Sequence, residues 1–484
     1  MDLHVLTDKY PFWRFFKEIS DIPRGSGNCA GISDYIVNFA KERGLRYRKD
    51  KSNNVIVFKD ASDDCTNDRT VMLQSHLDMV TVKRKDKIKD LKKEGIDLFI
   101  DGDFLKADGT SLGADDGIGV AYALEVLDDR GMSNPAIEAV FTTDEEIGML
   151  GADALDTSDL KSSFILNIDS EEEGVFTAGC AGTTICNIRF VPNVEKTKGN
   201  CFKISFKDLT GGHSGIEIDK HRGNAYRLLG RLIMRLNRSG ADVRYINVDG
   251  GGKDNAIAES CEAEILVGLE PDEFDNLFFE EAKKIKEAYF LSDSDMKIDL
   301  VNNGFSEMKE VFSEADSKKL TALLTHLPDG VVRMFGETSL MTETSLNLGI
   351  VNACKDFVDM SICLRSNVDS QREYLKDLLE DMVDRIDADI SFGPETQIWN
   401  YRKDSLLRDI ITDVYEKVSG KKGEVNVIHA GVECGFFTKK MPDTDCVSFG
   451  PRIDEIHTWN EKLSISSAEM YCEIIRETLK QLST

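Results

Sequence analysis

Residues 71–80 read VMLQSHLDMV, and this stretch decides how the chain is interpreted. The apolar run Val71, Met72 and Leu73 predicts a buried β-strand. A histidine and a carboxylate, His76 and Asp78, follow as soon as the apolar run ends. A hydrophobic core has no need of these two side chains, so the pattern indicates that the strand ends at a functional site.

Acids also follow two later predicted strands, AIEAVFTTDEE (136–146) and SSFILNID (162–169). The acids are Glu145, Glu146 and Asp169. In open α/β sheets, ligands gather outside the carboxyl ends of the strands. The placement of these residues is therefore the one that a binding or catalytic site requires.

Predicted helices alternate with these strands, at ISDYIVNFAKERG (32–44) and GIGVAYALEVLDD (117–129). The alternation predicts an α/β fold with a central mixed, largely parallel sheet flanked by helices. From about residue 185 the character changes to long amphipathic segments, such as NAYRLLGRLIMRLNR (224–238), and alternating strands, such as CEAEILVGLE (261–270). We interpret this region as a separate α/β layer.

Length and composition exclude several classes of protein. With 484 residues we expect two or three domains. A net charge of −27 disfavours a nucleic-acid partner, and the basic stretch at 83–93 is interleaved with acids. Eleven cysteines without CxxC pairs indicate a reducing, cytoplasmic location. No signal peptide and no apolar run long enough to span a membrane is apparent.

Two imidazoles and several carboxylates recur at strand ends and in glycine-bounded turns. The set is His76, Asp78, Asp115, Asp116, Glu145, Glu146, Asp169 and His457. Each of these residues alone would be an ordinary surface acid or core histidine. Together they suit zinc, with manganese or cobalt as alternatives. Since one catalytic zinc does not need so many carboxylates, the set favours two divalent metals that share a bridging carboxylate.

The motifs HLD, GADDG, DEE, NIDSEE and a late IH occur in an order that resembles the M20 metallopeptidases. Three further stretches resemble the aminoacyl-histidine dipeptidase branch, the peptidase D or cytosolic non-specific dipeptidase type. They are DIPRGSGN (21–28), TSLNLGIV (344–351) and HAGVECGFF (429–437). The resemblance extends over nearly the whole chain.

The resemblance implies a role for each residue of the metal set. Asp115 would bridge two metals, one of which also takes His76 and Asp169, while the other takes Glu146 and His457. Asp78 would orient His76, and Glu145 would be the general base that deprotonates a metal-activated water. One departure is visible, because Thr458, Trp459 and Asn460 replace the Ser-Pro-Asp that usually follows the last histidine.

His457 and Asp169 are far apart in the sequence, so the chain between them must leave the metal site and return. We therefore expect a discontinuous catalytic domain, 1–184 and 397–484, with an inserted domain at 185–396. The resemblance implies that the inserted domain is a lid that also forms a homodimer. It further implies that His213, in GGHSG (211–215), is the lid histidine, a donor to the oxyanion that in dimeric members reaches the partner's site.

A dipeptide carries an ammonium group at one end and a carboxylate at the other. Arg365 suits bidentate carboxylate binding, Asn255 could support it, and Glu433 could receive the ammonium. We therefore predict metal-dependent hydrolysis of unblocked dipeptides, including Xaa-His substrates such as β-alanyl-histidine. The alternatives are an aminoacylase or carboxypeptidase of the same superfamily, or a non-catalytic binding protein.

Overall fold

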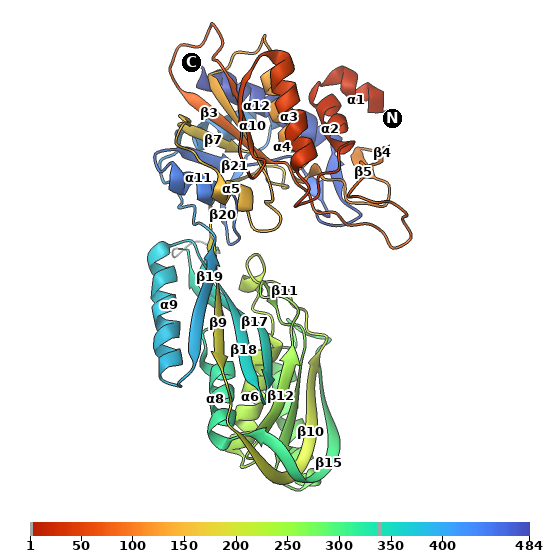
Figure 1. Ribbon diagram of the computed structural model, residues 1–484, viewed down its shortest axis with the longest axis vertical. Coiled ribbons are helices and arrows are strands. Elements are labelled where there is room, and N and C mark those ends of the chain that lie inside the picture. Colours follow the sequence, from red (N-terminus) through yellow and green to blue (C-terminus); the bar gives the residue numbers. More distant parts are fainter. Residues whose placement is uncertain (1–2, 336–340) are drawn as a thin grey trace. The chain divides into compact units, whose positions relative to one another are not determined.

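The structure is a computed structural model that describes residues 3–335 and 341–484. It divides into two compact units, each with its own hydrophobic core (Figure 1). Unit 1 contains Met1–Cys180, Trp399–Val427 and Val432–Thr484, and unit 2 contains Ala181–Ile398 and Ile428–Gly431. From the sequence we expected these boundaries at 184/185 and 396/397, with 428–431 in the catalytic domain. This short segment groups with unit 2 because His429 hydrogen-bonds to Ser345 and Asn367.

Unit 1 is built around an eight-stranded sheet with the order β1-β2-β6-β3-β7-β21-β8-β20. Its strands are β1 (Arg46–Lys49), β2 (Val55–Lys59), β3 (Thr70–His76), β6 (Ala136–Thr142), β7 (Phe164–Asn167), β8 (Val175–Cys180), β20 (Glu424–Ile428) and β21 (Asp445–Ser448). Parallel pairing joins the four central strands β6, β3, β7 and β21, whereas β1, β2 and β8 pair antiparallel to their neighbours. The mixed α/β sheet predicted from the sequence is confirmed.

The central strand β3 explains why the opening stretch is apolar. Val71, Met72 and Leu73 are fully buried, as expected for a parallel strand covered on both faces. The predicted strands at 136–146 and 162–169 are β6 and β7, which pair with β3 on either side. The carboxyl ends of these three parallel strands therefore meet at one edge of the sheet.

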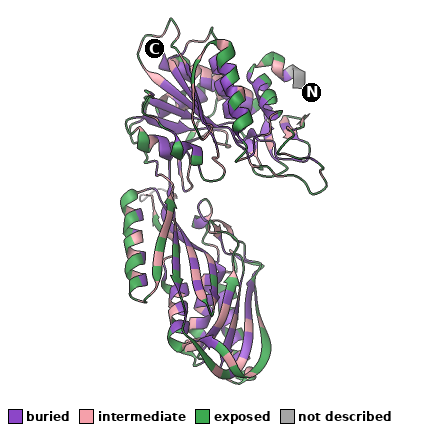
Figure 2. Ribbon diagram, viewed as in Figure 1, coloured by how far each residue is buried: buried purple, intermediate pink, exposed green. Residues whose placement is uncertain are grey.

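Helices cover this sheet, and buried residues, coloured purple in Figure 2, occur on both the helices and the strands. Together these residues form the core of unit 1. They are α1 (Leu3–Lys9), α2 (Phe12–Ser20), α3 (Ala30–Arg43), α4 (Ala114–Asp128), α5 (Leu150–Ala154), α10 (Leu406–Ser419), α11 (Cys434–Lys440) and α12 (Ile465–Leu482). A small antiparallel sheet adds β4 (Leu98–Asp101), β5 (Phe104–Ala107), β22 (Ile453–Asp454) and β23 (Lys462–Ser464). Helix α4 is buried along nearly its whole length, which explains its apolar sequence.

Unit 2 has a nine-stranded sheet in which the described pairings are antiparallel. Its strands are β9 (Gly182–Phe190), β10 (Val194–Lys207), β12 (Arg244–Gly250), β14 (Cys261–Val267), β15 (Lys297–Phe312), β16 (Gly330–Met334), β17 (Thr342–Cys354), β18 (Phe357–Ser366) and β19 (Asp389–Glu395). A separate two-stranded ladder pairs β11 (Gly212–His213) with β13 (Ala256–Ile257). This ladder carries the predicted lid histidine.

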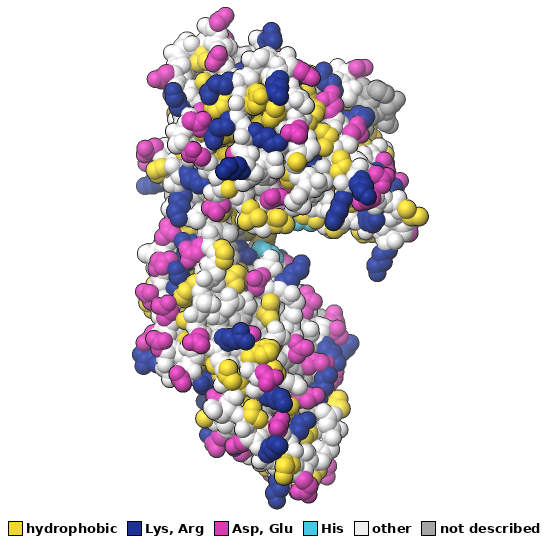
Figure 3. Space-filling view, viewed as in Figure 1, with side chains coloured by type: hydrophobic (Ala, Val, Ile, Leu, Met, Phe, Trp, Pro, Cys, Tyr) yellow, Lys and Arg dark blue, Asp and Glu magenta, His cyan; other side chains and the backbone are white. Residues whose placement is uncertain are grey.

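The helices of unit 2 are α6 (Ala225–Arg238), α7 (Pro271–Ala288), α8 (Glu314–His326) and α9 (Asp369–Asp384), with a short 3-10 helix at Ile218–Lys220. Leu229, Leu232 and Ile233 of α6 are fully buried in the core that these helices form with the sheet. Acidic and basic side chains alternate over the visible surface of both units (Figure 3). Within the described ranges, no helix combines the length and apolar character needed to cross a bilayer.

Candidate functional site

His76 lies at the carboxyl end of β3, and carboxylates from two other elements surround it. Its Nε2 lies 3.0 Å from Oδ1 of Asp115 and 3.3 Å from Oδ1 of Asp169. Asp169 follows β7, and Asp115 lies at the start of α4, where the backbone is not yet helical. His76 is 1% exposed. The parallel strands thus bring together residues that the sequence could only group by pattern.

Asp78 lies on the other side of the His76 ring and also connects to the turn after β6. Its carboxylate is 3.5 Å from Nδ1 of His76 and accepts hydrogen bonds from the backbone N–H groups of Glu145 (3.1 Å) and Glu146 (3.3 Å). Burial raises the pKa of Asp78, but hydrogen bonding to His76 and Ser26 outweighs burial and lowers it to about 2. Asp78 is therefore an anion that holds both the histidine and the acidic turn.

A second group of ligand-type side chains shares Asp115. The other carboxylate oxygen of Asp115, Oδ2, lies 3.1 Å from Nε2 of His457, and Glu146 approaches the same nitrogen at 3.0 Å. In the metal-free protein these two carboxylates raise the pKa of His457 to about 10. His76 also has a raised pKa, because nearby carboxylates outweigh the effect of its burial.

Three sets of side chains in the described residues place their ligand atoms within 4.8 Å of one another. They are His76, Asp116 and Asp169; His76, Glu145 and Glu146; and Asp115, Glu146 and His457. Asp116 already accepts hydrogen bonds from the backbone N–H groups of His76 and Gly119, so its oxygens are partly used. Imidazole nitrogens and carboxylate oxygens at this spacing are a donor set that fits a divalent transition metal.

Glu145 borders the same cluster. Burial raises the pKa of Glu145 well above its ordinary value, and the neighbouring carboxylates of Asp169 and Glu433 raise it further. A carboxyl group with a raised pKa is suited to accept a proton near neutral pH and to release it again.

Glu433, immediately before α11, is fully buried in unit 1. Its Oε2 accepts hydrogen bonds from Gln74 (2.5 Å) and Thr142 (2.7 Å), whereas its Oε1 has no hydrogen-bond partner among the described residues. Burial is the main cause that raises the pKa of Glu433 to about 7. An unpartnered oxygen on a buried carboxyl is costly unless it serves a ligand.

His213 lies in unit 2, in the β11 ladder. Its Nδ1 accepts hydrogen bonds from the backbone N–H groups of Gly215 and Ile216, both at 3.1 Å. Burial and the charge of Arg365 lower the pKa of His213 to about 4. The side chain is therefore neutral at physiological pH, and its proton resides on Nε2, which leaves that nitrogen as a hydrogen-bond donor.

Arg365, on β18, is 5% exposed. Its Nη1 donates to Oγ1 of Thr183 at 2.9 Å, and its Nε has no hydrogen-bond partner within the described part of the chain. Asn255 is exposed, and its described contact is a backbone one, in which its carbonyl accepts from the N–H of Ser214 at 2.9 Å. The structure thus leaves Arg365 as a buried cation with donors to spare, and joins Asn255 to the His213 turn.

Comparison with known proteins identifies the family. Residues 72–481 match the model of peptidase family M20/M25/M40. The chain is also 33% identical to the cytosol non-specific dipeptidase of Escherichia coli (strain K12) over 479 residues, which cover 98% of this chain and 97% of that protein.

The chain belongs to peptidase family M20.

Solved structures agree with this assignment. The aminoacylhistidine dipeptidase of Vibrio alginolyticus superposes with a TM-score of 0.88 at 34% identity, covering 97% of this chain and 96% of the other. Aminopeptidase PepT of Bacillus cereus ATCC 10987 shares the fold, with a TM-score of 0.57 at 15% identity over the full length of both chains.

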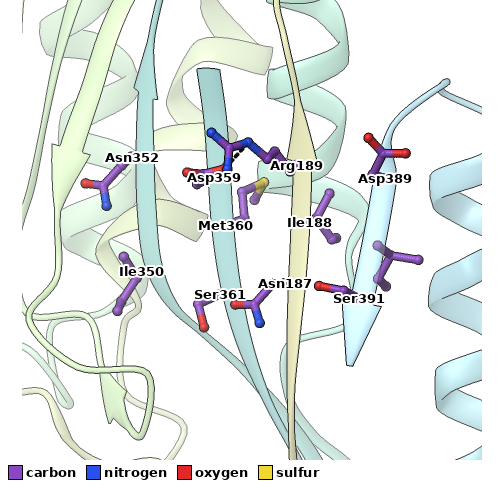
Figure 4. A pocket seen from close by; sticks show the side chains of 11 residues that line it. Asn187, Ile188, Arg189, Ile350, Asn352, Asp359, Met360, Ser361, Asp389 and Ser391 are labelled. Carbon is purple, nitrogen blue, oxygen red and sulfur yellow. Dashed lines mark ion pairs between the residues drawn. The ribbon is translucent and has the colours of Figure 1, made fainter. Parts of the chain in front are cut away.

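A hollow on the sheet of unit 2 lacks the grouped histidine and carboxylate side chains of the metal-type cluster in this M20 chain. It is formed by β9, β17, β18 and β19, and its charged residues include Arg189, Asp359 and Asp389 (Figure 4). Arg189 and Asp359 pair with each other at 3.2 Å, and their side chains are 63% and 42% exposed. None of the residues predicted from the sequence lines this hollow.

Several buried polar residues of this M20 chain were not predicted from the sequence. Arg24 and Glu461 contact the segments that carry the metal-type residues, and His429 hydrogen-bonds to Ser345 and Asn367 in unit 2. Their only signal in the sequence was their position inside or beside stretches that resemble the family. A buried arginine or glutamate has no periodicity that separates it from a surface residue.

Proposed function

We propose that this M20 peptidase hydrolyses unblocked dipeptides at a centre that holds two divalent metals. The observation that carries the proposal is the geometry around Asp115. Its two carboxylate oxygens face two different histidines, His76 at 3.0 Å and His457 at 3.1 Å. A carboxylate placed between two imidazoles is the arrangement that a bridging ligand needs.

The proposed ligands divide into two groups that share Asp115. His76 and Asp169 complete one group, and Glu146 and His457 complete the other. We propose zinc as the resident metal, with manganese or cobalt as alternatives, because the donors are imidazole and carboxylate rather than thiolate. When bound, such metals polarise a carbonyl group and make a water molecule more acidic.

Glu145 is the proposed general base. It is not needed as a ligand, its raised pKa makes it a stronger base than an ordinary carboxylate, and its backbone N–H donates to Asp78 at 3.1 Å. Glu145 would take the proton from the attacking water and give it to the leaving amine. Asp78 would keep His76 in the orientation that leaves Nε2 free for a metal.

His213 is the proposed donor to the developing oxyanion. Because Gly215 and Ile216 donate to Nδ1, the proton must be on Nε2 for the neutral ring, so His213 can donate but does not add a charge.

The two ends of a free dipeptide match two buried groups. Within residues 3–335 and 341–484, one carboxylate oxygen of Glu433 has no partner and could receive the ammonium, and Nε of Arg365 has none and could bind the carboxylate. Asn255 is proposed to support the carboxylate end through the turn that it shares with His213. Xaa-His dipeptides, including β-alanyl-histidine, are the expected substrates, as the names of the relatives suggest.

We further propose that unit 2 is a lid and forms a homodimer, as the sequence resemblance implies. We also propose a cytoplasmic location, which the name of the Escherichia coli relative supports. The cysteines also support this location, because none of the eleven, all within the described ranges, forms a disulfide.

The test compares kcat/KM for one good dipeptide in free, N-acetylated, C-terminally amidated and one-residue-extended forms, using the zinc-loaded protein. The free dipeptide should be the best substrate, because each blocked end leaves Glu433 or Arg365 buried without a counter-charge. If the N-acetylated form is hydrolysed as fast as the free form, the dipeptidase proposal is wrong and an aminoacylase-like activity replaces it.

A further inference from the structure

Glu461 is a buried acid that the proposed chemistry does not use. It lies four residues after His457 and is 3% exposed. Its Oε2 accepts hydrogen bonds from the backbone N–H groups of Leu112 (2.9 Å) and Gly113 (3.0 Å). Its Oε1 accepts hydrogen bonds from those of Ala114 (2.8 Å) and Asp115 (3.4 Å). One carboxylate thus satisfies four consecutive N–H groups of the turn that presents Asp115.

Arg24 holds the same turn from another side. Its Nη1 donates to the carbonyl oxygens of Leu77 and Asp78, both at 3.0 Å, and its Nη2 donates to the carbonyl oxygen of Gly113. Gly113 has φ 70°, and a Cβ there would lie 2.6 Å from Nη2 of Arg24. Only glycine therefore fits between the guanidinium and the backbone at this position.

These contacts connect three segments that carry proposed ligands. Arg24 joins the loop of His76 to the turn of Asp115, and Glu461 joins that turn to the loop of His457. His457 itself is 45% exposed and has φ 59°, so packing of its own side chain does little to fix it. Strands β22 and β23 pair at the two ends of its loop, and the buried carboxylate of Glu461 joins the loop itself to the turn of Asp115.

We infer that Glu461 is a positioning residue which docks the C-terminal loop on the turn of Asp115 and thereby delivers His457 to the second metal. This inference rests on the two-metal centre proposed above. Without the dock, His457 must be ordered by the metal itself, and the entropy of ordering the loop is then subtracted from the binding free energy. Loss of residues that orient ligands typically weakens metal binding by about 10- to 100-fold.

The experiment measures zinc binding by equilibrium dialysis against buffered zinc, so its readout is not hydrolysis. The variant is Glu461→Gln, which keeps the shape but turns an NH₂ donor toward backbone N–H donors. The control is Glu455→Gln in the same loop, at an exposed residue with the same change of charge. Urea unfolding of the chelator-treated proteins checks that each variant folds, and Glu461→Asp takes the place of Glu461→Gln if the latter does not.

Glu461→Gln should bind one zinc as tightly as the wild type and the other about 10- to 100-fold more weakly, whereas Glu455→Gln should bind both normally. In a His457→Ala background, Glu461→Gln should change the affinity for the remaining zinc less than about threefold, since the two residues act through one loop. The inference is overturned if Glu461→Gln binds both zincs with normal affinity. It is also overturned if Glu461→Gln lowers zinc affinity by the same factor in the wild type and in His457→Ala. A wild-type protein that binds a single zinc refutes the two-metal proposal instead.

Discussion

Replacing Glu433 with glutamine tests the most specific part of the proposed substrate recognition. The carboxyl group is fully buried, two donors hold its Oε2, and its Oε1 is unpartnered. Glutamine keeps the size of the side chain and a carbonyl acceptor but removes the charge. The expected change is thus the loss of one ion pair with the substrate ammonium, without a cavity.

The expected fall in kcat/KM can be estimated from the burial of the Glu433 carboxyl group. Removing one partner of a buried charge pair costs about 2–5 kcal/mol, and about 2 kcal/mol is the minimum here, because Gln74 and Thr142 already donate to the single oxygen that glutamine offers. At about 1.4 kcal/mol for each factor of ten, kcat/KM for a free dipeptide should fall at least about 30-fold. The much smaller kcat/KM for an N-acetylated dipeptide should stay within about threefold, since that substrate never formed the pair.

Although Glu433→Gln should lower kcat/KM, it should raise the free energy of unfolding above pH 7. Burial raises the pKa of Glu433 from an ordinary 4.5 to about 7, so the folded protein holds this proton more tightly than the unfolded chain does. The wild type therefore loses stability relative to Glu433→Gln as pH rises from about 4.5 through 7. The full difference is on the order of 3 kcal/mol, because a tenfold change in proton affinity is worth about 1.4 kcal/mol.

The assay combines steady-state kinetics on the free and N-acetylated substrates with urea unfolding of metal-free protein at pH 5 and pH 8. Glu424→Gln, at an exposed residue of β20, is the matched control and should change neither quantity. The reasoning is refuted if Glu433→Gln loses the same factor on both substrates, or if it is less stable than the wild type at pH 8. Either result would make Glu433 a structural residue.

Three further predictions concern the proposed metal centre and His213. Glu145→Gln should keep two bound zincs by elemental analysis yet lose on the order of 10²-fold or more in kcat, whereas Glu146→Gln should lose metal; near-normal turnover of zinc-loaded Glu145→Gln would contradict the base assignment. Chelation should abolish activity. Zinc affinity measured by dialysis should fall as pH is lowered from 8 to 6, because protons compete with the metal for His76 and for His457, whose pKa is about 10 in the metal-free protein. A pH-independent affinity would exclude these histidines as ligands. His213→Ala should lower kcat about 10²-fold with unchanged zinc content, and the residual rate should show no titration near pH 4; an unchanged kcat would remove the proposed donor.

The sequence determined the parts of the fold that local pattern encodes. Apolar runs at 71–75 and 162–169 became the buried parallel strands β3 and β7, and the helical period at 32–44 became α3, which closes on Gly44 with φ 68°. The order of HLD, GADDG, DEE and the late IH was sufficient to indicate the family, because ligand types at strand ends are a local property. The residues gathered from that pattern do lie together in unit 1.

Only the tertiary structure decided which buried polar groups support that site. Glu461 contacts the turn of Asp115 across 346 or more positions of sequence, and Gln74 donates to Glu433 across 359. Such pairs carry no period and no spacing rule, since their geometry exists only after the sheet and the C-terminal segment have packed. The same holds for protonation, because the burial that raises the pKa of Glu433 and lowers that of His213 is a property of the surrounding atoms rather than of the residue type. Sequence pattern can therefore name the groups that meet a metal, while the charges and contacts that tune them come from the packed chain.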